Sequence, residues 1–223
     1  MKKISAMSPI KSSSASFARW EGIQMVTGVA LSIFMLTHMV LVASILLDLG
    51  NGFVFNLITK FFAITYGDYI VVPVVLSLLF IHFIAAARKL PFRVNEMKTM
   101  WVHSRRFKHS DTWLWVIQTL TAFIILVIAC AHIWTMITSL PMGAAKSAAR
   151  VQGGYWLGAY LLLLISVELH LAIGMFRVGI KWGFINSKNR EKWNKYKKLF
   201  SAIMIILGLA SLIVFYWVVD ANI

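Results

Sequence analysis

The chain has 223 residues, of which 60% are hydrophobic and only 13% are charged, and its formal net charge is +14. Because a soluble domain carries about 25% charged residues, this composition excludes an ordinary water-soluble enzyme and favours an integral membrane protein. The charge does not indicate a nucleic-acid-binding protein either, because the basic residues lie in short gaps between apolar runs and form no polar stripe. We therefore expect membrane lipid, and no nucleic acid, around this chain.

Five apolar stretches are long enough to cross a bilayer, since a membrane-spanning helix needs about 20 mostly apolar residues. A strand alone in lipid would leave its backbone unpaired, so all five are predicted to be helices and the stretches between them polar breaks. The first is too long for a signal-peptide core, and we expect it to be retained. Residues 1–223 are predicted to form one all-α transmembrane domain, with spans at 22–47, 70–87, 113–139, 155–179 and 199–219.

The Lys and Arg residues are distributed unequally between the two sides of the membrane. The N-terminal tail, the gap 88–112 and the segment 177–198 together carry nineteen of the 22, and the opposite side carries three. Short basic loops face the cytoplasm, so the N-terminus is predicted to be cytoplasmic. The single cysteine, Cys130, excludes covalent haem attachment through a Cys-x-x-Cys-His motif, so any haem would be b-type.

Histidines provide the main functional signal. Two of them, His103 and His109, fall in the basic gap 88–112 and are interpreted as solvated loop residues. Ionisable residues inside membrane spans are rare and are functional candidates by default. The other four histidines lie one in each of the first four spans: His38, His82, His132 and His170.

The depths of these four histidines divide them into two pairs. At about 1.5 Å per helical residue, His82 and His170 lie roughly 9–10 Å inside the cytoplasmic boundary, and His38 and His132 roughly 10–15 Å inside the other. In an up-down-up-down bundle the first and third helices face each other diagonally, as do the second and fourth. Each pair could therefore offer two imidazoles to one haem iron, with one haem near each surface. A zinc cluster would need three or four ligands at one point, which two levels of two do not provide.

Glu168 is the only carboxylate deep within a predicted span. Two residues separate it from His170, which is about 200° of helical rotation, so it should point away from a haem bound by His170. Two interpretations remain open. Glu168 is either a structural acid hydrogen-bonded within the bundle or a proton-relay group in the membrane.

Several motifs carry a resemblance to a known family. These motifs are Thr27-Gly28 to Thr37-His38, Ile81-His82 to Arg88-Lys89-Leu90-Pro91, His109-Ser110-Asp111-Thr112 to Trp115 and Gln118, and Val167-Glu168-Leu169-His170 followed by Lys181-Trp182-Gly183. In these motifs, and across all five spans, the chain resembles the di-haem cytochrome b subunit of menaquinone-linked fumarate reductase/succinate dehydrogenase. The first four spans are predicted to form the haem-binding bundle, and the fifth, which has no histidine, to pack beside it.

The resemblance implies an electron-transferring, non-flavin subunit of an enzyme complex in the bacterial cell inner membrane. It implies a flavoprotein subunit and an iron–sulfur subunit on the cytoplasmic face, menaquinone or menaquinol as substrate, and allows a dimer of such heterotrimers. It implies two haem b groups, a proximal one on His82 and His170 and a distal one on His38 and His132. The residues matching family contacts to the proximal haem propionates are Gln24, Trp115 and Lys181.

One departure from the family affects the quinone site. A glutamate tied to menaquinol oxidation in relatives has no counterpart in the stretch 59–62. The nearest acids on that side are Asp48 and Asp68, and each can equally cap or solvate a loop.

Two rival functions remain open. The first is a di-haem cytochrome b of another quinone-linked complex, of the formate dehydrogenase or hydrogenase type. The second is a haem-free transporter or anchor. The groups for fumarate reduction and succinate oxidation are the same, so the sequence is compatible with both directions.

Overall fold

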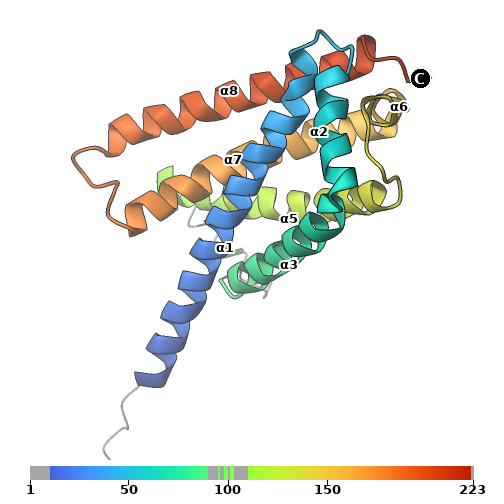
Figure 1. Ribbon diagram of the computed structural model, residues 1–223. Coiled ribbons are helices and arrows are strands. Elements are labelled where there is room, and N and C mark those ends of the chain that lie inside the picture. The colour runs from blue at the N-terminus through green and yellow to red at the C-terminus, as the bar shows by residue number, and fades with distance from the viewer. Residues whose placement is uncertain (1–10, 90–94, 96–97, 100, 103–109, 222–223) are drawn as a thin grey trace, which may run out of the picture.

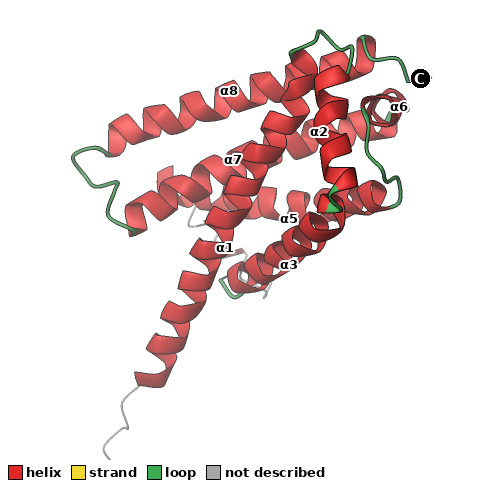
Figure 2. Ribbon diagram, in the orientation of Figure 1, coloured by secondary structure: helices red, strands yellow, loops and turns green. Residues whose placement is uncertain are grey.

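The computed structural model describes residues 11–89, 95, 98–99, 101–102 and 110–221. All regular structure in these residues is helical (Figure 2). His103 and His109 lie outside the described residues. The elements are α1 (Lys11–Ala43), the short 3-10 helix η1 (Ser44–Leu46), α2 (Phe53–Ile64), α3 (Gly67–Ala87), α5 (Ser110–Ile137), α6 (Ala144–Gln152), α7 (Tyr155–Lys181) and α8 (Arg190–Trp217).

The five predicted membrane spans are confirmed as helices long and apolar enough to cross a bilayer, by length and composition. They are Ser16–Leu46, Gly67–Ala87, Thr112–Ile137, Tyr155–Lys181 and Arg190–Trp217. The last helix begins at Arg190, nine residues before the predicted start at 199, because a polar stretch extends the helix ahead of its apolar run. Within this stretch Lys195 pairs with Glu191 at 3.0 Å, an i,i+4 contact that supports a helix in water.

Two of the predicted polar breaks contain helices. At about 1.5 Å per residue, the 12 residues of α2 reach only about 18 Å, which is too short to cross the bilayer. Helix α6 has 9 residues, four of them alanine, the strongest helix former. Both helices were missed from the sequence, because the prediction rested on apolar stretches of about 20 residues.

The apolar core lies at one end of the bundle, where the short helices close it. Phe55 of α2 stacks edge-on against Phe215 of α8, with ring centroids 5.4 Å apart. The cluster joins η1, α2, α6 and α8 through Ile45, Phe55, Ala144, Ala148, Val151, Phe215 and Val219. Because this core sits at the end, the middle of the bundle is left for a different use.

The fifth spanning helix packs beside the other four, as expected from the sequence. Helix α8 lies along α7, while α1 pairs with α3 and α5 pairs with α7 (Figure 1). Gly208 permits the close approach of α8 to α7, because a Cβ at this position would lie 2.5 Å from Cδ1 of Leu164. A side chain at 208 would therefore require Leu164 to move.

The opposite end of the bundle is held by charged groups. The Glu21 carboxylate on α1 pairs with Lys89, just after α3, at 3.2 Å, and with Lys181 at the end of α7. Arg88 lies over the Trp20 ring, 5.1 Å from its centroid. These contacts bring the start of α1 and the ends of α3 and α7 together, as an up-and-down bundle requires.

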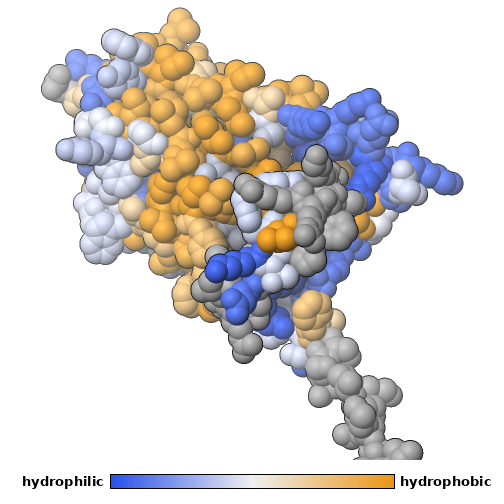
Figure 3. All heavy atoms as spheres, turned by 180° about the vertical axis from the view of Figure 1, so that it is seen from behind, coloured by the Kyte–Doolittle hydropathy of each residue, from blue (hydrophilic) through white to orange (hydrophobic). Residues whose placement is uncertain are grey.

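The surface carries an apolar belt between two more polar ends. Large apolar side chains are exposed on the spanning helices, for example Val127 (70%) and Ile206 (66%). Figure 3 shows this belt in orange, with hydrophilic residues gathered at the end where α7 leads into α8. Such a surface is suited to lipid, which cannot satisfy exposed polar groups.

Asp48 organises the loop that leads into α2. Its carboxylate accepts hydrogen bonds from the backbone N–H of Val54 at 2.9 Å and of Gly52 at 3.3 Å. The N–H of Val54, supported by that of Gly52, holds the pKa of this carboxyl below its ordinary value. Desolvation, which raises the pKa, has a smaller effect than the Val54 bond alone. Asp48 thus caps α2, which agrees with the capping role considered for it from the sequence.

Replacing Asp48 with Ala should weaken the first turn of α2 by about 1 kcal/mol, because two backbone donors lose their acceptor. Since folding lowers the pKa, this stabilisation is fully present above the ordinary carboxyl pKa of about 4 and is lost as the pH falls through the folded value. The measurement is hydrogen exchange of residues 52–56 in the detergent-solubilised protein at several pH values. Equal exchange in wild type and D48A at neutral pH would contradict the assignment, and E191A at the other end serves as control.

Candidate functional site

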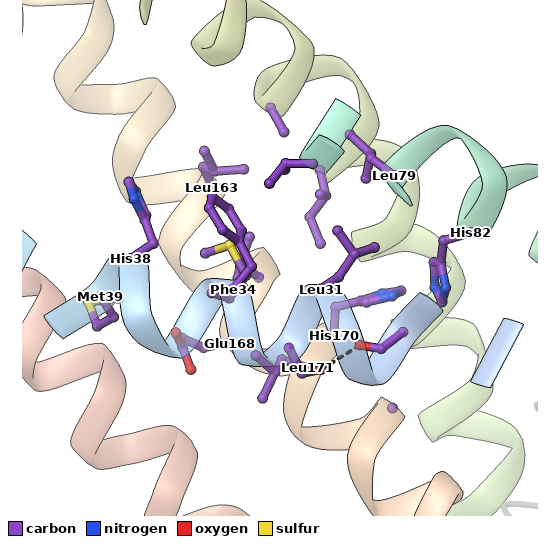
Figure 4. A pocket seen from close by; sticks show the side chains of 18 of the residues that line it. Leu31, Phe34, His38, Met39, Leu79, His82, Leu163, Glu168, His170 and Leu171 are labelled. Atoms are coloured by element: carbon purple, nitrogen blue, oxygen red, sulfur yellow. Dashed lines mark hydrogen bonds between the residues drawn. The ribbon is translucent and has the colours of Figure 1, made fainter. Parts of the chain in front are cut away.

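The structure brings together the histidines that the depth argument had paired. The rings of His82 on α3 and His170 on α7 have centroids 6.5 Å apart and planes at 81°. Those of His38 on α1 and His132 on α5 have centroids 6.1 Å apart and planes at 67°. Figure 4 shows His82 and His170 together at one level and His38 at another. The two levels therefore each present two imidazoles from opposite helices.

All four histidines line one elongated cavity of about 1340 Å³. A pocket for one small ligand measures about 300–1,000 Å³, so this cavity exceeds the needs of one such molecule. Its walls between the two levels are largely apolar and include Leu31, Phe34, Leu79 and Leu163 (Figure 4). The space left by the displaced core is thus a long apolar chamber with an imidazole pair at each level.

The Nδ1 atoms of His82 and His170 are held by the neighbouring helices. His82 Nδ1 lies 3.1 Å from Thr27 Oγ1 on α1. His170 Nδ1 lies 3.0 Å from the backbone oxygen of Gln118 and 3.3 Å from Thr121 Oγ1 on α5. A hydrogen bond at one ring nitrogen fixes which nitrogen remains free as a ligand.

The second pair has different surroundings. His132 Nδ1 is buried and has no hydrogen-bond partner among the described residues. The ring of His132 meets Tyr160 edge-on at 5.4 Å, and Phe34 stacks on His38 at 5.7 Å. Aromatic contacts therefore orient these two rings.

The residues present fit a haem group. An imidazole nitrogen lies about 2 Å from a metal that it binds, so two ligands on opposite sides of one iron have ring centroids about 6 Å apart, close to both observed separations. Gly28 lets the His82 ring pack closely against α1, since a Cβ there would lie 2.9 Å from Cε1 of His82. Among the described residues no three His, Cys, Asp or Glu side chains converge as a metal cluster would need.

Buried polar atoms without partners also concentrate on this cavity. The described residues contain five such side-chain atoms, and four belong to residues that line the cavity: Gln24, His132, Tyr160 and Glu168. Buried polar groups are normally hydrogen-bonded, so each exception needs an explanation. For Gln24, one turn from Glu21 at the charged end of the cavity, a bound group with polar substituents would provide one.

The three residues matched to propionate contacts lie on the cavity wall. Gln24 and Trp115 line it from α1 and α5, and the Gln24 Oε1 atom has no partner in the described part of the chain. Lys181 lines the cavity at its basic end, where it pairs with Glu21. All three side chains could therefore contact a group bound in the cavity, although Lys181 also forms an ion pair with Glu21.

Glu168 lies on α7 with only 2% of its surface exposed. It lines the same cavity, and its Oε2 atom has no hydrogen-bond partner within the described residues. In Figure 4 its carboxyl lies between the levels of His38 and His170 and is directed away from the His170 ring. Of the two acids considered for the quinone site, Asp68 lines the cavity whereas Asp48 caps α2.

Sequence reasoning missed several residues that the structure brings to the histidines. Thr27, Thr121 and Tyr160 contact the rings, and Arg150 of α6 lines the cavity and donates to Met136 Sδ at 3.9 Å. The available signal was a repeated spacing, Gln24-x-x-Thr27 on α1 and Gln118-x-x-Thr121 on α5. Arg150 has no such signal in the sequence, where it is only one of the three basic residues on the side opposite the cytoplasm.

Comparisons with known proteins agree with this architecture. Residues 94–215 match the family model described as the succinate dehydrogenase/fumarate reductase transmembrane subunit. The fumarate reductase cytochrome b subunit of Helicobacter pylori is 35% identical over 208 residues, 89% of this chain and 80% of the relative. That of Wolinella succinogenes is 33% identical over 221 residues, 94% of this chain and 86% of the relative.

A more distant relative is the succinate dehydrogenase cytochrome b558 subunit of Bacillus subtilis, 23% identical over 115 residues, 49% of this chain and 57% of the relative. The family model covers more than half of the chain, and the two fumarate reductase relatives are matched over most of their length. This chain therefore belongs to the family of succinate dehydrogenase/fumarate reductase transmembrane subunits.

Proposed function

We propose that the chain is the di-haem cytochrome b subunit and membrane anchor of a fumarate reductase/succinate dehydrogenase complex. In this function it carries electrons between menaquinol or menaquinone and an iron–sulfur subunit. The observation that supports it most directly is the presence of two facing imidazole pairs at two levels of one apolar cavity. The named relatives favour this complex over a formate dehydrogenase or hydrogenase type.

The proposed cofactors are two haem b groups. His82 and His170 would hold the iron of the proximal haem, and His38 and His132 that of the distal haem. When bound, haem provides one-electron chemistry at a potential set by its ligands and surroundings. The contribution of this chain is to fix the imidazoles, exclude water with apolar walls and meet the propionates with Gln24, Trp115 and Lys181.

The proposed orientation places the basic end of the bundle in the cytoplasm of the bacterial inner membrane. Fifteen of the 22 Lys and Arg residues lie in the segments 88–112 and 177–198. The ion pairs of Glu21 with Lys89 and Lys181 gather parts of both segments at one end. We assign this end to the iron–sulfur subunit, which in turn would carry the flavoprotein, and a dimer of such heterotrimers is compatible with it.

The haem assignment predicts selective loss. Replacing His82 or His170 with Ala should remove the proximal haem, and replacing His38 or His132 should remove the distal haem, because each iron loses one of two protein ligands. The haem-to-chain ratio and the low-spin signals of the purified complex measure this. Two haems in the wild-type complex are expected, and two low-spin haems in every single variant would contradict the assignment.

The orientation predicts where the partners dock. Chemical cross-links from the iron–sulfur subunit should reach lysines of the basic end, such as Lys188, Lys192 and Lys195. Links to Lys60 or Lys146, at the other end, would reverse the proposed orientation. The control is the same cross-linking reaction in high salt, where these links should be lost because exposed charge pairs weaken with ionic strength.

Glu168 is proposed to relay a proton across the membrane alongside the electrons. If quinol is oxidised outside and fumarate reduced inside, electrons alone would charge the membrane, at a cost of about 2.3 kcal/mol per unit charge per 100 mV. A proton moving in the same direction cancels that charge. The support is a buried carboxyl on the cavity wall between the two imidazole levels, without a hydrogen-bond partner for Oε2 in the described residues.

The variant E168Q keeps the shape of the side chain but removes its titration. It should retain both haems and dye-linked fumarate reduction yet lose most quinol-linked turnover. The control is E191Q, which changes an exposed acid of the cytoplasmic end and should behave as wild type. Full quinol-linked turnover in E168Q would leave Glu168 a structural residue.

A further inference from the structure

Two equivalent segments of neighbouring helices hold the rings of His82 and His170. Each segment has the sequence Gln-x-x-Thr: Gln24 to Thr27 on α1 reaches His82, and Gln118 to Thr121 on α5 reaches His170. Both use the threonine hydroxyl, and on α5 the backbone oxygen of Gln118 adds a hydrogen bond of 3.0 Å with His170 Nδ1. The same local solution thus occurs twice, once on each side of the pair.

The hydrogen bonds of the threonines assign the imidazole protons. Thr27 Oγ1 donates to the backbone oxygen of Ile23 at 2.7 Å, and Thr121 Oγ1 donates to that of Ile117 at 2.8 Å. A hydroxyl has one hydrogen, so with that hydrogen on the carbonyl of the preceding turn each oxygen accepts from the ring that it faces, and Nδ1 carries the ring hydrogen. For His170 the backbone oxygen of Gln118, which can only accept, requires the same assignment independently. The Nε2 atom of each ring is left unprotonated, as a metal ligand must be.

The backbone of α1 adds a steric constraint on one of these rings. The His82 ring lies against Gly28, the residue after Thr27, where a Cβ would come within 2.9 Å of Cε1 and 3.4 Å of Nδ1. The ring therefore has a hydrogen-bonded edge and a close backbone contact at the same time. The orientation of the ring is therefore restricted by the backbone of α1 as well as by Thr27.

The other histidine pair lacks this arrangement in the described part of the chain. His132 Nδ1 is buried without a partner, and its ring contacts Tyr160 edge-on. An edge-on aromatic contact restricts the ring but does not determine which nitrogen carries the hydrogen. The two sites therefore differ in how far their ligands are prepared for a metal.

We propose that the two Gln-x-x-Thr segments are positioning elements that preorganise His82 and His170, so that this pair holds its haem more firmly than His38 and His132 hold theirs. This inference rests on the proposed di-haem function. It follows from the rule that hydrogen bonds to a metal-bound imidazole set its orientation and basicity, and that their loss weakens metal binding by about 10–100-fold. Thr27 and Thr121 act through the histidines and touch no reacting atom.

The test compares threonine variants of the assembled complex. T27V and T121V remove a hydroxyl at similar size, T27S and T121S retain it, and T138V is the control. The Thr138 hydroxyl bonds the carbonyls of Trp134 and Thr135 of its own helix and is exposed. The readouts are the rate of haem transfer to excess apomyoglobin and the low-spin electron paramagnetic resonance signal of each haem, with the H82A complex identifying which signal belongs to which site.

In wild type the haem of His82 and His170 should be lost more slowly than the other. Both valine variants should release it about tenfold or more faster and shift its signal, with the second haem unchanged, and both serine variants should restore wild-type behaviour. Because T27V and T121V change different helices, an assembly failure in one leaves the other as the test.

The inference is overturned if the valine variants that assemble match T138V, or if they release both haems equally faster. Failure of the proposed function gives a different result, a wild-type complex without two b haems. The two failures are therefore distinguished by the wild-type measurement alone.

Discussion

The interior of a bilayer offers no hydrogen-bond partner, so every polar group within a span must find one in the protein. The backbone of this chain meets that demand by being helical throughout its spans. Hydroxyl groups donate hydrogen bonds to backbone carbonyls of the preceding turn, as Ser32 does to Gly28 at 2.8 Å and Ser211 to Leu207 at 2.9 Å. Four histidines and a glutamate cannot be satisfied in this local way. Their presence in lipid therefore requires the interior that the helices enclose.

That interior also determines how the bundle is held together. A cavity of about 1340 Å³ runs through the middle of the bundle, so the apolar core cannot lie there. The fixed contacts lie at its two ends, with the apolar cluster around Phe55 and Phe215 at one and the ion pairs of Glu21 at the other.

Much of this architecture could be predicted from the sequence, because depth in a membrane is nearly a one-dimensional quantity. Fixed rise per residue and alternating helix direction put His82 level with His170 and His38 level with His132, and the structure brings both pairs together. The haem ligation assigned to them stays a prediction. The short helices α2 and α6 could not be predicted in this way, because both are shorter than a membrane span. Their ends also depend on tertiary contacts, such as the hydrogen bond from Ala144 N–H to Asn56 Oδ1 at 2.7 Å.

The polar partners of the histidines could not be predicted for a different reason. Whether Thr27 meets His82 depends on the rotation of two helices about their axes and on one side-chain rotamer, and the apolar pattern of a lipid-exposed helix does not specify either. A lipid-facing side and a cavity-facing side are both apolar in this chain. The usual contrast between a buried apolar face and an exposed polar face is therefore missing.

Helix α7 connects the separate parts of this system. It carries His170 and Glu168 two residues apart, its neighbours include α5 and α8, and its last residue, Lys181, pairs with Glu21. Because residues two apart on a helix project in nearly opposite directions, the same helix can present an imidazole to one level of the cavity and a carboxyl toward the region between the levels. A shift of α7 along its axis would move both groups together. The two groups proposed to serve electron transfer and proton transfer are therefore carried by one helix. The contacts of His170 with Thr121 and Gln118 on α5 and the ion pair of Lys181 hold that helix in place.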